Sequence, residues 1–93
     1  MDWKPYDPTW LARLARTACP QEPWLAEALM TCTRAVEESR AYLRFVDATE
    51  ANQPNSGWRF ERNIVLEHPK EGSLVLDVLH GGRVGGVEFL SRL

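Results

Sequence analysis

The chain has 93 residues, of which 44% are hydrophobic and 26% are charged, and its formal net charge is −2. This length suits one small domain, residues 1–93, with a modest core. The slightly acidic balance argues against nucleic-acid binding, which normally needs a basic surface. No apolar run reaches membrane length and the N-terminus lacks the pattern of a signal peptide, so we expect a cytoplasmic protein that does not bind membranes.

The cysteines and tryptophans are expected mainly in the interior. Cys19 and Cys32 match neither a CxxC motif nor a zinc-ligand spacing, and one pair does not make a disulfide framework. We predict two small, buried thiols in a reducing compartment. Most of the four tryptophans are expected to pack in the core, with Trp3 the best candidate for an exposed one. No cofactor is expected.

A short helix is predicted over residues 8–18. Asp7 is a suitable N-cap, and Pro8 suits the first helical position. Apolar residues then recur at helical spacing to the end of this range. The Cys19-Pro20 pair ends the helix, because the residue before a proline disfavours the α region.

A long helix is predicted over residues 23–48. Pro23 stands in its first turn, and Glu22 places a carboxylate near the positive end of the helix dipole. A broad apolar stripe at helical spacing follows, with charged residues on the opposite side. The stripe consists of Trp24, Leu25, Ala28, Leu29, Cys32, Ala35, Val36, Leu43 and Val46.

The rest of the chain has the periodicity of strands. A loop is predicted over residues 50–57, and a three-stranded antiparallel meander over residues 58–91. Its first strand, residues 58–67, has Trp58, Phe60, Ile64 and Leu66 at one parity. The predicted fold is therefore α+β: a helical half over residues 8–48, with one short and one long helix, packed on the meander.

The last two predicted strands flank a Gly81-Gly82 pair, which is a strong signal for a hairpin turn. With a two-residue loop at this position, the side chains on one face of the hairpin point to the core and those on the other face point to solvent. The expected core face carries Leu74, Leu76, Val78, Val87 and Phe89. The expected second face carries Val75, Asp77, Leu79, Val84 and Glu88. Gly85-Gly86 leaves a gap in this second face, where a partner's backbone could approach closely.

No pattern for catalysis or metal binding is found, and we predict that the protein is not an enzyme. The two histidines, His68 and His80, are expected at opposite ends of the middle strand, too far apart to act as a general acid–base pair. A metal site formed by His80, Asp77 and Glu88 is conceivable, but the spacing matches no known ligand pattern. No catalytic residue and no metal ligand is therefore assigned.

Carboxylates are concentrated in the strand-forming half of the chain. Solvation is the ordinary explanation of such a charge excess; a docking surface for a basic partner is the functional one, since charge steers association. The candidate partner-binding residues are Asp77, Leu79, Val84, Glu88, Glu61 and Glu67.

The C-terminal segment, residues 63–90, contains the pattern Leu-Asp-Val followed by Gly-Arg-Val-Gly-Gly-Val-Glu-Phe-Leu. In this pattern the segment resembles the small immunity proteins of bacterial contact-dependent growth inhibition and related polymorphic-toxin systems. The resemblance spans about a third of the chain. It transfers no interface residues, because these vary with the toxin.

The resemblance implies a cytosolic inhibitor that acts by binding alone. Such a protein binds the C-terminal toxin domain of a sibling effector, often a nuclease, and a monomer in a 1:1 complex is expected. Nuclease toxins tend to be basic because they bind phosphates, and an acidic inhibitor fits them. The same acidic surface would also serve an antitoxin, a phage-encoded inhibitor or a subunit of a larger assembly, and these alternatives stay open.

Overall fold

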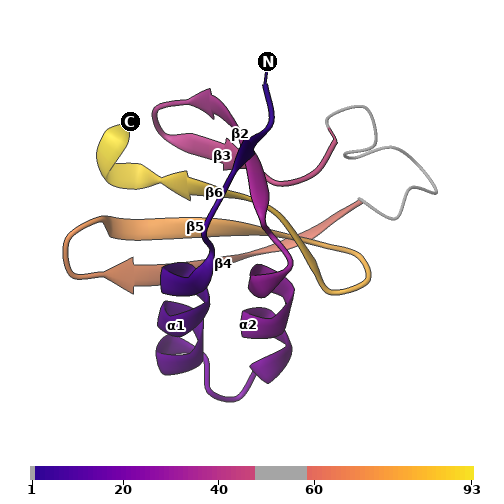
Figure 1. Ribbon diagram of the computed structural model, residues 1–93. Helices are drawn as coiled ribbons and strands as arrows, with labels where there is room; N and C mark the ends of the chain where they lie inside the picture. The colour runs from indigo at the N-terminus through magenta and orange to yellow at the C-terminus, as the bar shows by residue number, and fades with distance from the viewer. Residues whose placement is uncertain (1, 48–58) are drawn as a thin grey trace.

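A computed structural model describes residues 2–47 and 59–93, which form two helices and six strands (Figure 1). The fold class is α+β, but the predicted three-stranded meander is wrong. The described residues form one six-stranded antiparallel sheet, in the order β1-β2-β3-β6-β5-β4. In chain order the elements are β1 (Lys4–Pro5), α1 (Thr9–Ala18), α2 (Pro23–Met30), β2 (Arg34–Ser39), β3 (Tyr42–Arg44), β4 (Phe60–His68), β5 (Gly72–Leu79), β6 (Arg83–Phe89) and the 3₁₀ turn η1 (Leu90–Arg92).

The start of α1 lies one residue from its predicted position. The Thr9 amide donates a hydrogen bond of 3.0 Å to the Asp7 carboxylate, so this side chain satisfies a free N–H group of the first turn. The hydrogen bonds from Thr9 hold the pKa of Asp7 below its ordinary value. The predicted short helix is therefore confirmed.

The predicted long helix is wrong, because α2 ends at Met30 and the following segment forms the β2–β3 hairpin. At the end of α2 the Thr31 hydroxyl donates to the Ala28 carbonyl at 2.7 Å, which satisfies an acceptor of the last turn. The apolar positions after this point fit a helical stripe, but they also fit a strand. In the sheet Leu43 lies opposite Val87, and this pairing of β3 with β6 decides the conformation.

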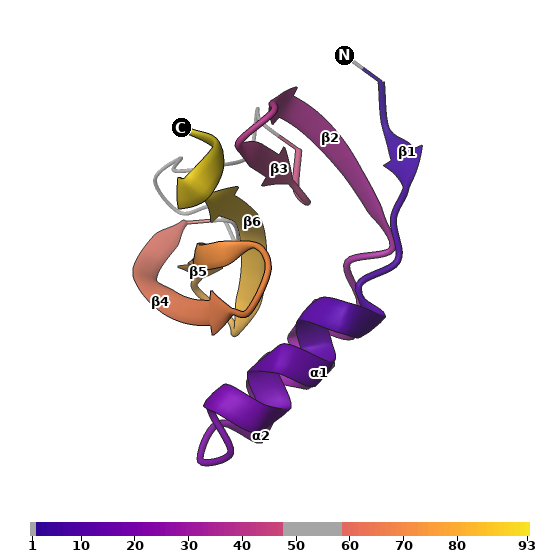
Figure 2. The same cartoon turned by 90° about the vertical axis from the view of Figure 1, so that its left-hand side faces the viewer.

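The two helices lie side by side on the concave side of a curved sheet (Figures 1 and 2). Helix α1 contacts β4, and α2 contacts β6. The core between them is apolar: Leu11, Leu25, Leu29, Leu66, Leu74, Leu76, Val78 and Val87 are all 0% exposed. Each such side chain contributes roughly 1.5–3 kcal/mol by its burial. All five residues of the expected core face of the last hairpin are buried, as predicted.

The register of the β5–β6 hairpin agrees with the prediction only at its far end. Leu76 lies opposite Val87 as expected, but a β-bulge shifts the pairing beyond Asp77. The pair nearest the turn is Leu79 and Arg83, so the turn has three residues, and two of them are glycines with φ of 86° and 72°. Val84 consequently faces the core and is 3% exposed, contrary to its predicted place on the second face.

A second bulge changes the parity of β4 near its start. Phe60 lies opposite Leu79 and Arg62 opposite Val78, so Glu61 is the extra residue. Phe60 is therefore 42% exposed instead of sharing the buried face with Ile64 and Leu66. Trp58 and the predicted loop over residues 50–57 lie outside the described residues.

Candidate functional site

The face of the sheet turned away from the helices is the candidate functional site, and we call it the outer face. Strand pairing defines its members, because residues opposite one another share a face. They are Tyr42, Arg44, Phe60, Asn63, Val65, Glu67, Ser73, Val75, Asp77, Leu79, Arg83, Gly86 and Glu88. Three of these thirteen are carboxylates and two are cations.

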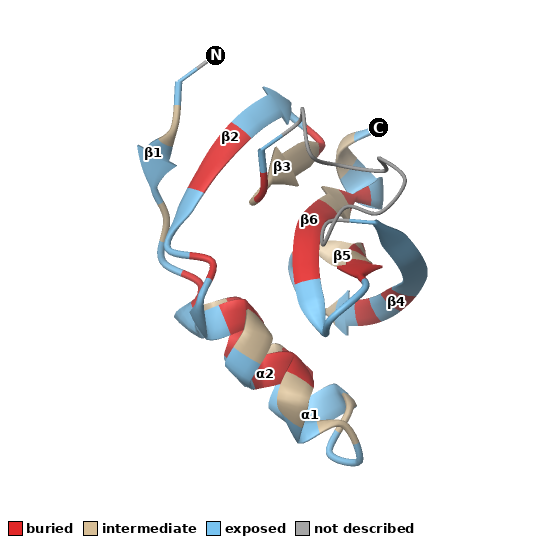
Figure 3. Cartoon of the chain, turned by 90° about the vertical axis from the view of Figure 1, so that its right-hand side faces the viewer, coloured by how far each residue is buried: buried red, intermediate tan, exposed pale blue. Residues whose placement is uncertain are grey.

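The centre of the outer face is a row across four strands: Val65, Val75, Glu88 and Tyr42. Val65 on the edge strand β4 is 57% exposed. The other three are half-buried. Figure 3 shows the corresponding contrast between β4, which is largely exposed, and β6, which is largely buried. An acidic residue set among apolar side chains can form a stronger ion pair with a partner, because the neighbours reduce the local dielectric.

Tyr42 and Asp77 form a hydrogen bond across β6. The Tyr42 hydroxyl donates to the Asp77 carboxylate at 2.7 Å, and the phenol lies directly over Gly86. Burial and this bond raise the pKa of Tyr42 above its ordinary value. The gap expected at Gly85-Gly86 is thus filled from within the chain, because the Leu79 side chain also covers Gly85.

The other two carboxylates of the outer face are available to a partner. Glu67 accepts a hydrogen bond of 2.8 Å from the Ser73 hydroxyl, and in the described part of the chain Glu88 forms no ion pair. Of the two cations, Arg44 is already paired with Glu38 and its side chain is only 12% exposed, whereas Arg83 is exposed beside the β5–β6 turn. The outer face therefore carries three carboxylates against two cations, and Glu38 already occupies one of these cations.

The structure brings together three of the six predicted partner-binding residues. Asp77, Glu88 and Glu67 lie on the outer face. Leu79 faces the same side but is 4% exposed, and Val84 is in the core. Glu61 lies in the β4 bulge, 3.9 Å from the His80 ring nitrogen. It is six residues along the strand from Glu67, which corresponds to about 20 Å.

The histidines do not meet. His68 ends β4 and lies opposite Gly72 at the start of β5, whereas His80 follows the end of β5. The two histidines therefore lie at opposite ends of β5, as predicted. The His68 Nδ1 atom accepts hydrogen bonds from the amides of Lys70 and Glu71, at 3.1 and 3.0 Å, and so stabilises the β4–β5 turn. Within residues 2–47 and 59–93 no three potential metal-ligating side chains gather.

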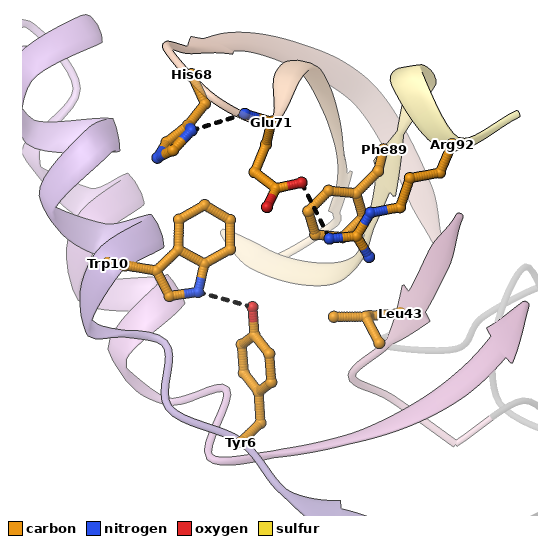
Figure 4. Close-up of a pocket in the computed structure, with 7 residues that line it drawn as sticks. All are labelled: Tyr6, Trp10, Leu43, His68, Glu71, Phe89 and Arg92. Carbon is orange, nitrogen blue, oxygen red and sulfur yellow. Dashed lines mark hydrogen bonds and ion pairs between the residues drawn. The ribbon is translucent and has the colours of Figure 1, made fainter. Parts of the chain in front are cut away.

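The sequence did not indicate a pocket of about 430 Å³ beside the β4–β5 turn (Figure 4). Its walls come from segments far apart in the chain, and no motif spacing links them. The lining residues are Tyr6, Trp10, Leu43, His68, Glu71, Phe89 and Arg92. The richness of the chain in aromatic residues was the only available signal.

The polar groups of this pocket are bonded to one another. The Trp10 indole donates to the Tyr6 hydroxyl at 3.1 Å, and burial raises the pKa of that phenol. The Arg92 guanidinium is paired with the Glu71 carboxylate at 3.0 Å and lies 3.9 Å from the centre of the Phe89 ring. The pocket thus holds an ion pair against an aromatic wall.

The fold and the outer face define an α+β domain whose curved sheet is covered by helices on one side. No protein-family model matches the chain, and no curated protein or solved structure is significantly similar to it. No helix of the described residues is both long enough and apolar enough to cross a bilayer. The function is therefore inferred from the residues of the chain and their geometry.

Proposed function

We propose that the chain is an immunity protein, a cytoplasmic inhibitor that binds a cognate toxin domain and blocks it without chemistry of its own. The observation that carries this proposal is the charge of the outer face. Glu67, Asp77 and Glu88 lie around the exposed Val65 and the half-buried Val75, and Arg44, one of the two cations of this face, is already paired with Glu38. Such a surface is complementary to a basic, nuclease-like toxin.

The outer face supplies both parts of a protein interface. Val65 and Val75 offer apolar area on neighbouring strands, with Tyr42 two strands further on. Aromatic and apolar side chains of this kind form the centre of interfaces, and carboxylates at their margin raise the association rate and set specificity. A toxin arginine or lysine would pair with Glu88 at the centre and with Glu67 toward the β4–β5 turn.

The first experiment is co-expression of the chain with the open reading frame beside its gene. We expect the two proteins to co-purify as a 1:1 complex, and cells that carry both to survive when the neighbour alone is toxic. A harmless neighbour that forms no complex would overturn the proposal. A stable complex with a harmless neighbour would instead indicate a subunit of an assembly.

The outer face is tested by charge reversal. Glu88→Lys and Glu67→Lys should each weaken toxin binding at least about tenfold, mainly through slower association, because each places like charges together. Asp77→Lys is a poorer test, since it also removes the acceptor of the Tyr42 hydroxyl. The matched control is Glu27→Lys, an exposed residue of α2 on the helical side. The outer face would be removed from the proposal if Glu88→Lys and Glu67→Lys bind the toxin as tightly as the control Glu27→Lys does, with circular dichroism showing that all three are folded.

A further inference from the structure

The aromatic pocket described above is a separate feature from the outer face. Tyr6, Trp10, Leu43 and Phe89 supply apolar walls, and Figure 4 shows Glu71 and Arg92 directed toward each other between them. Its volume of about 430 Å³ lies in the range of roughly 300–1,000 Å³ that is usual for ligand sites.

The pocket already holds a cation, and the contacts of this cation indicate which kind of group fits the position. The Arg92 guanidinium stacks on Phe89 and pairs with Oε1 of Glu71. A guanidinium suits this position because it is planar and weakly hydrated, so it can stack on a ring and bond a carboxylate at once. Glu71 is the only carboxylate among the lining residues. Without Arg92, the position would be an empty cation site of charge −1.

Arg92 can leave its position without unfolding the turn that carries it. Two bonds hold this turn independently of the Arg92 side chain: Arg40 Nε donates to the Arg92 carbonyl at 3.0 Å, and the Ser91 hydroxyl donates to the Glu71 carbonyl at 2.8 Å. The Arg92 side chain is 38% exposed, so its path to solvent is open. Rotation of this side chain vacates the site, at the loss of the ion pair with Glu71 and of the hydrogen bond of 3.2 Å that the guanidinium donates to the Arg40 carbonyl.

We propose that this pocket is a binding site for an arginine side chain of a protein partner, and that Arg92 is its intramolecular competitor. The incoming guanidinium takes the place of Arg92 on Phe89 and Glu71, and its aliphatic part lies against Trp10 and Leu43. The displaced Arg92 moves into solvent. The pocket and the outer face consist of different residues, so this inference goes beyond the proposed function and does not depend on it.

The test measures binding of a small cation to the full chain in the absence of any toxin. The probe is propylguanidinium chloride, and propylurea is the neutral probe of the same shape. Binding is followed by NMR through the indole N–H signal of Trp10, at constant ionic strength. Arg92→Ala should bind propylguanidinium about three- to tenfold more tightly than the wild type, since an exposed ion pair and a cation–π contact no longer compete.

Two further variants identify the cause of that gain. Arg92→Ala combined with Glu71→Gln should lose it, whereas Arg16→Ala, which removes an exposed cation of α1, should bind like the wild type. The proposal is overturned if Arg92→Ala binds propylguanidinium no more tightly than the wild type. Equal binding of propylurea would also overturn it, because the pocket would then be a purely apolar site.

Discussion

At the scale of single residues, the outer face depends on the absence of a side chain at Gly86. A Cβ atom there would collide with the Tyr42 hydroxyl and lie 2.7 Å from the carbonyl oxygen of Leu43. The hydroxyl can move only by losing Asp77, and the carbonyl belongs to the β3–β6 pairing. We expect Gly86→Ala to lower the free energy of unfolding by about 2–3 kcal/mol, measured by urea denaturation.

The matched control for this prediction is Gly81→Ala in the β5–β6 turn. No atom lies within 4 Å of the Cβ position there, and its φ of 86° is the only source of strain. Its cost should stay near about 1 kcal/mol. Equal costs for the two variants would show that Tyr42 does not occupy the space over Gly86.

Tyr42→Phe tests the hydrogen bond itself. It leaves the half-buried Asp77 carboxylate without this donor, so the free energy of unfolding at pH 8 should fall by about 1–2 kcal/mol. The pKa of Tyr42 is raised from its ordinary value of 10.0 by folding. The stabilisation is therefore fully present below about pH 10 and is lost as the pH rises toward the folded pKa.

The pH dependence tests the burial of this ionisable hydroxyl together with its bond, since burial is the larger cause of the raised pKa of Tyr42. The free energy of unfolding of the wild type should decrease above pH 10, and that of Tyr42→Phe should decrease less steeply. Urea denaturation at several values between pH 8 and pH 11 measures both slopes. Parallel slopes would contradict the raised pKa.

At the scale of elements, local signals predicted the parts of the fold that local interactions determine. The prolines placed the starts of both helices to within one residue, although the N-cap of α1 is Pro8 and not the expected Asp7, and the alternation of Leu74, Leu76 and Val78 placed the core face of β5. The end of α2 was not predictable in this way. The stripe through Ala35, Val36 and Leu43 satisfies a helical period, and only β6, about forty residues further along the chain, supplies the partner that favours a strand.

The errors in the predicted candidate site come from the two β-bulges, which belong to the pairing of strands. A bulge displaces side chains by one position. The bulge at Glu61 has no distinctive sequence, whereas the one beyond Asp77 has Gly85 as its extra residue, and a glycine inside a strand is a signal for a bulge. Val84 was placed on the wrong face because the prediction omitted this bulge. Asp77 and Glu88 were placed on one face correctly, because the predicted pairing of Val75 with Glu88 and of Asp77 with Gly86 was right, whereas Glu67 was expected only beside that face.

At the scale of the whole molecule, the strand order implies a gradient of stability across the sheet. β5 is hydrogen-bonded to neighbours on both sides and supplies three side chains to the core, namely Leu74, Leu76 and Val78. β1 is the edge strand farthest from β5, and it has only two residues, which pair with β2 alone and are exposed. Opening β1 exposes little apolar surface, whereas opening β5 disrupts the core and amounts to global unfolding.

Amide hydrogen exchange should therefore be slowest in β5 and β6 and fastest in β1, with rates that differ by at least about 100-fold after correction for intrinsic exchange. The β2–β3 hairpin should exchange at intermediate rates, and its pattern of protection is the most informative test of the sheet. β3 lies between β2 and β6, so its amides are hydrogen-bonded on both sides and protection should be continuous over residues 42–44. Residues 36–39 of β2 pair with β3 alone, so protection should alternate there between amides that face β3 and amides that face away from it. Continuous protection over residues 36–39 would instead be the signature of a helix and would contradict the six-stranded sheet. Alternating protection in β2 beside continuous protection in β3 would show that β3 is hydrogen-bonded on both sides, which is the pairing that extends the outer face beyond the three C-terminal strands.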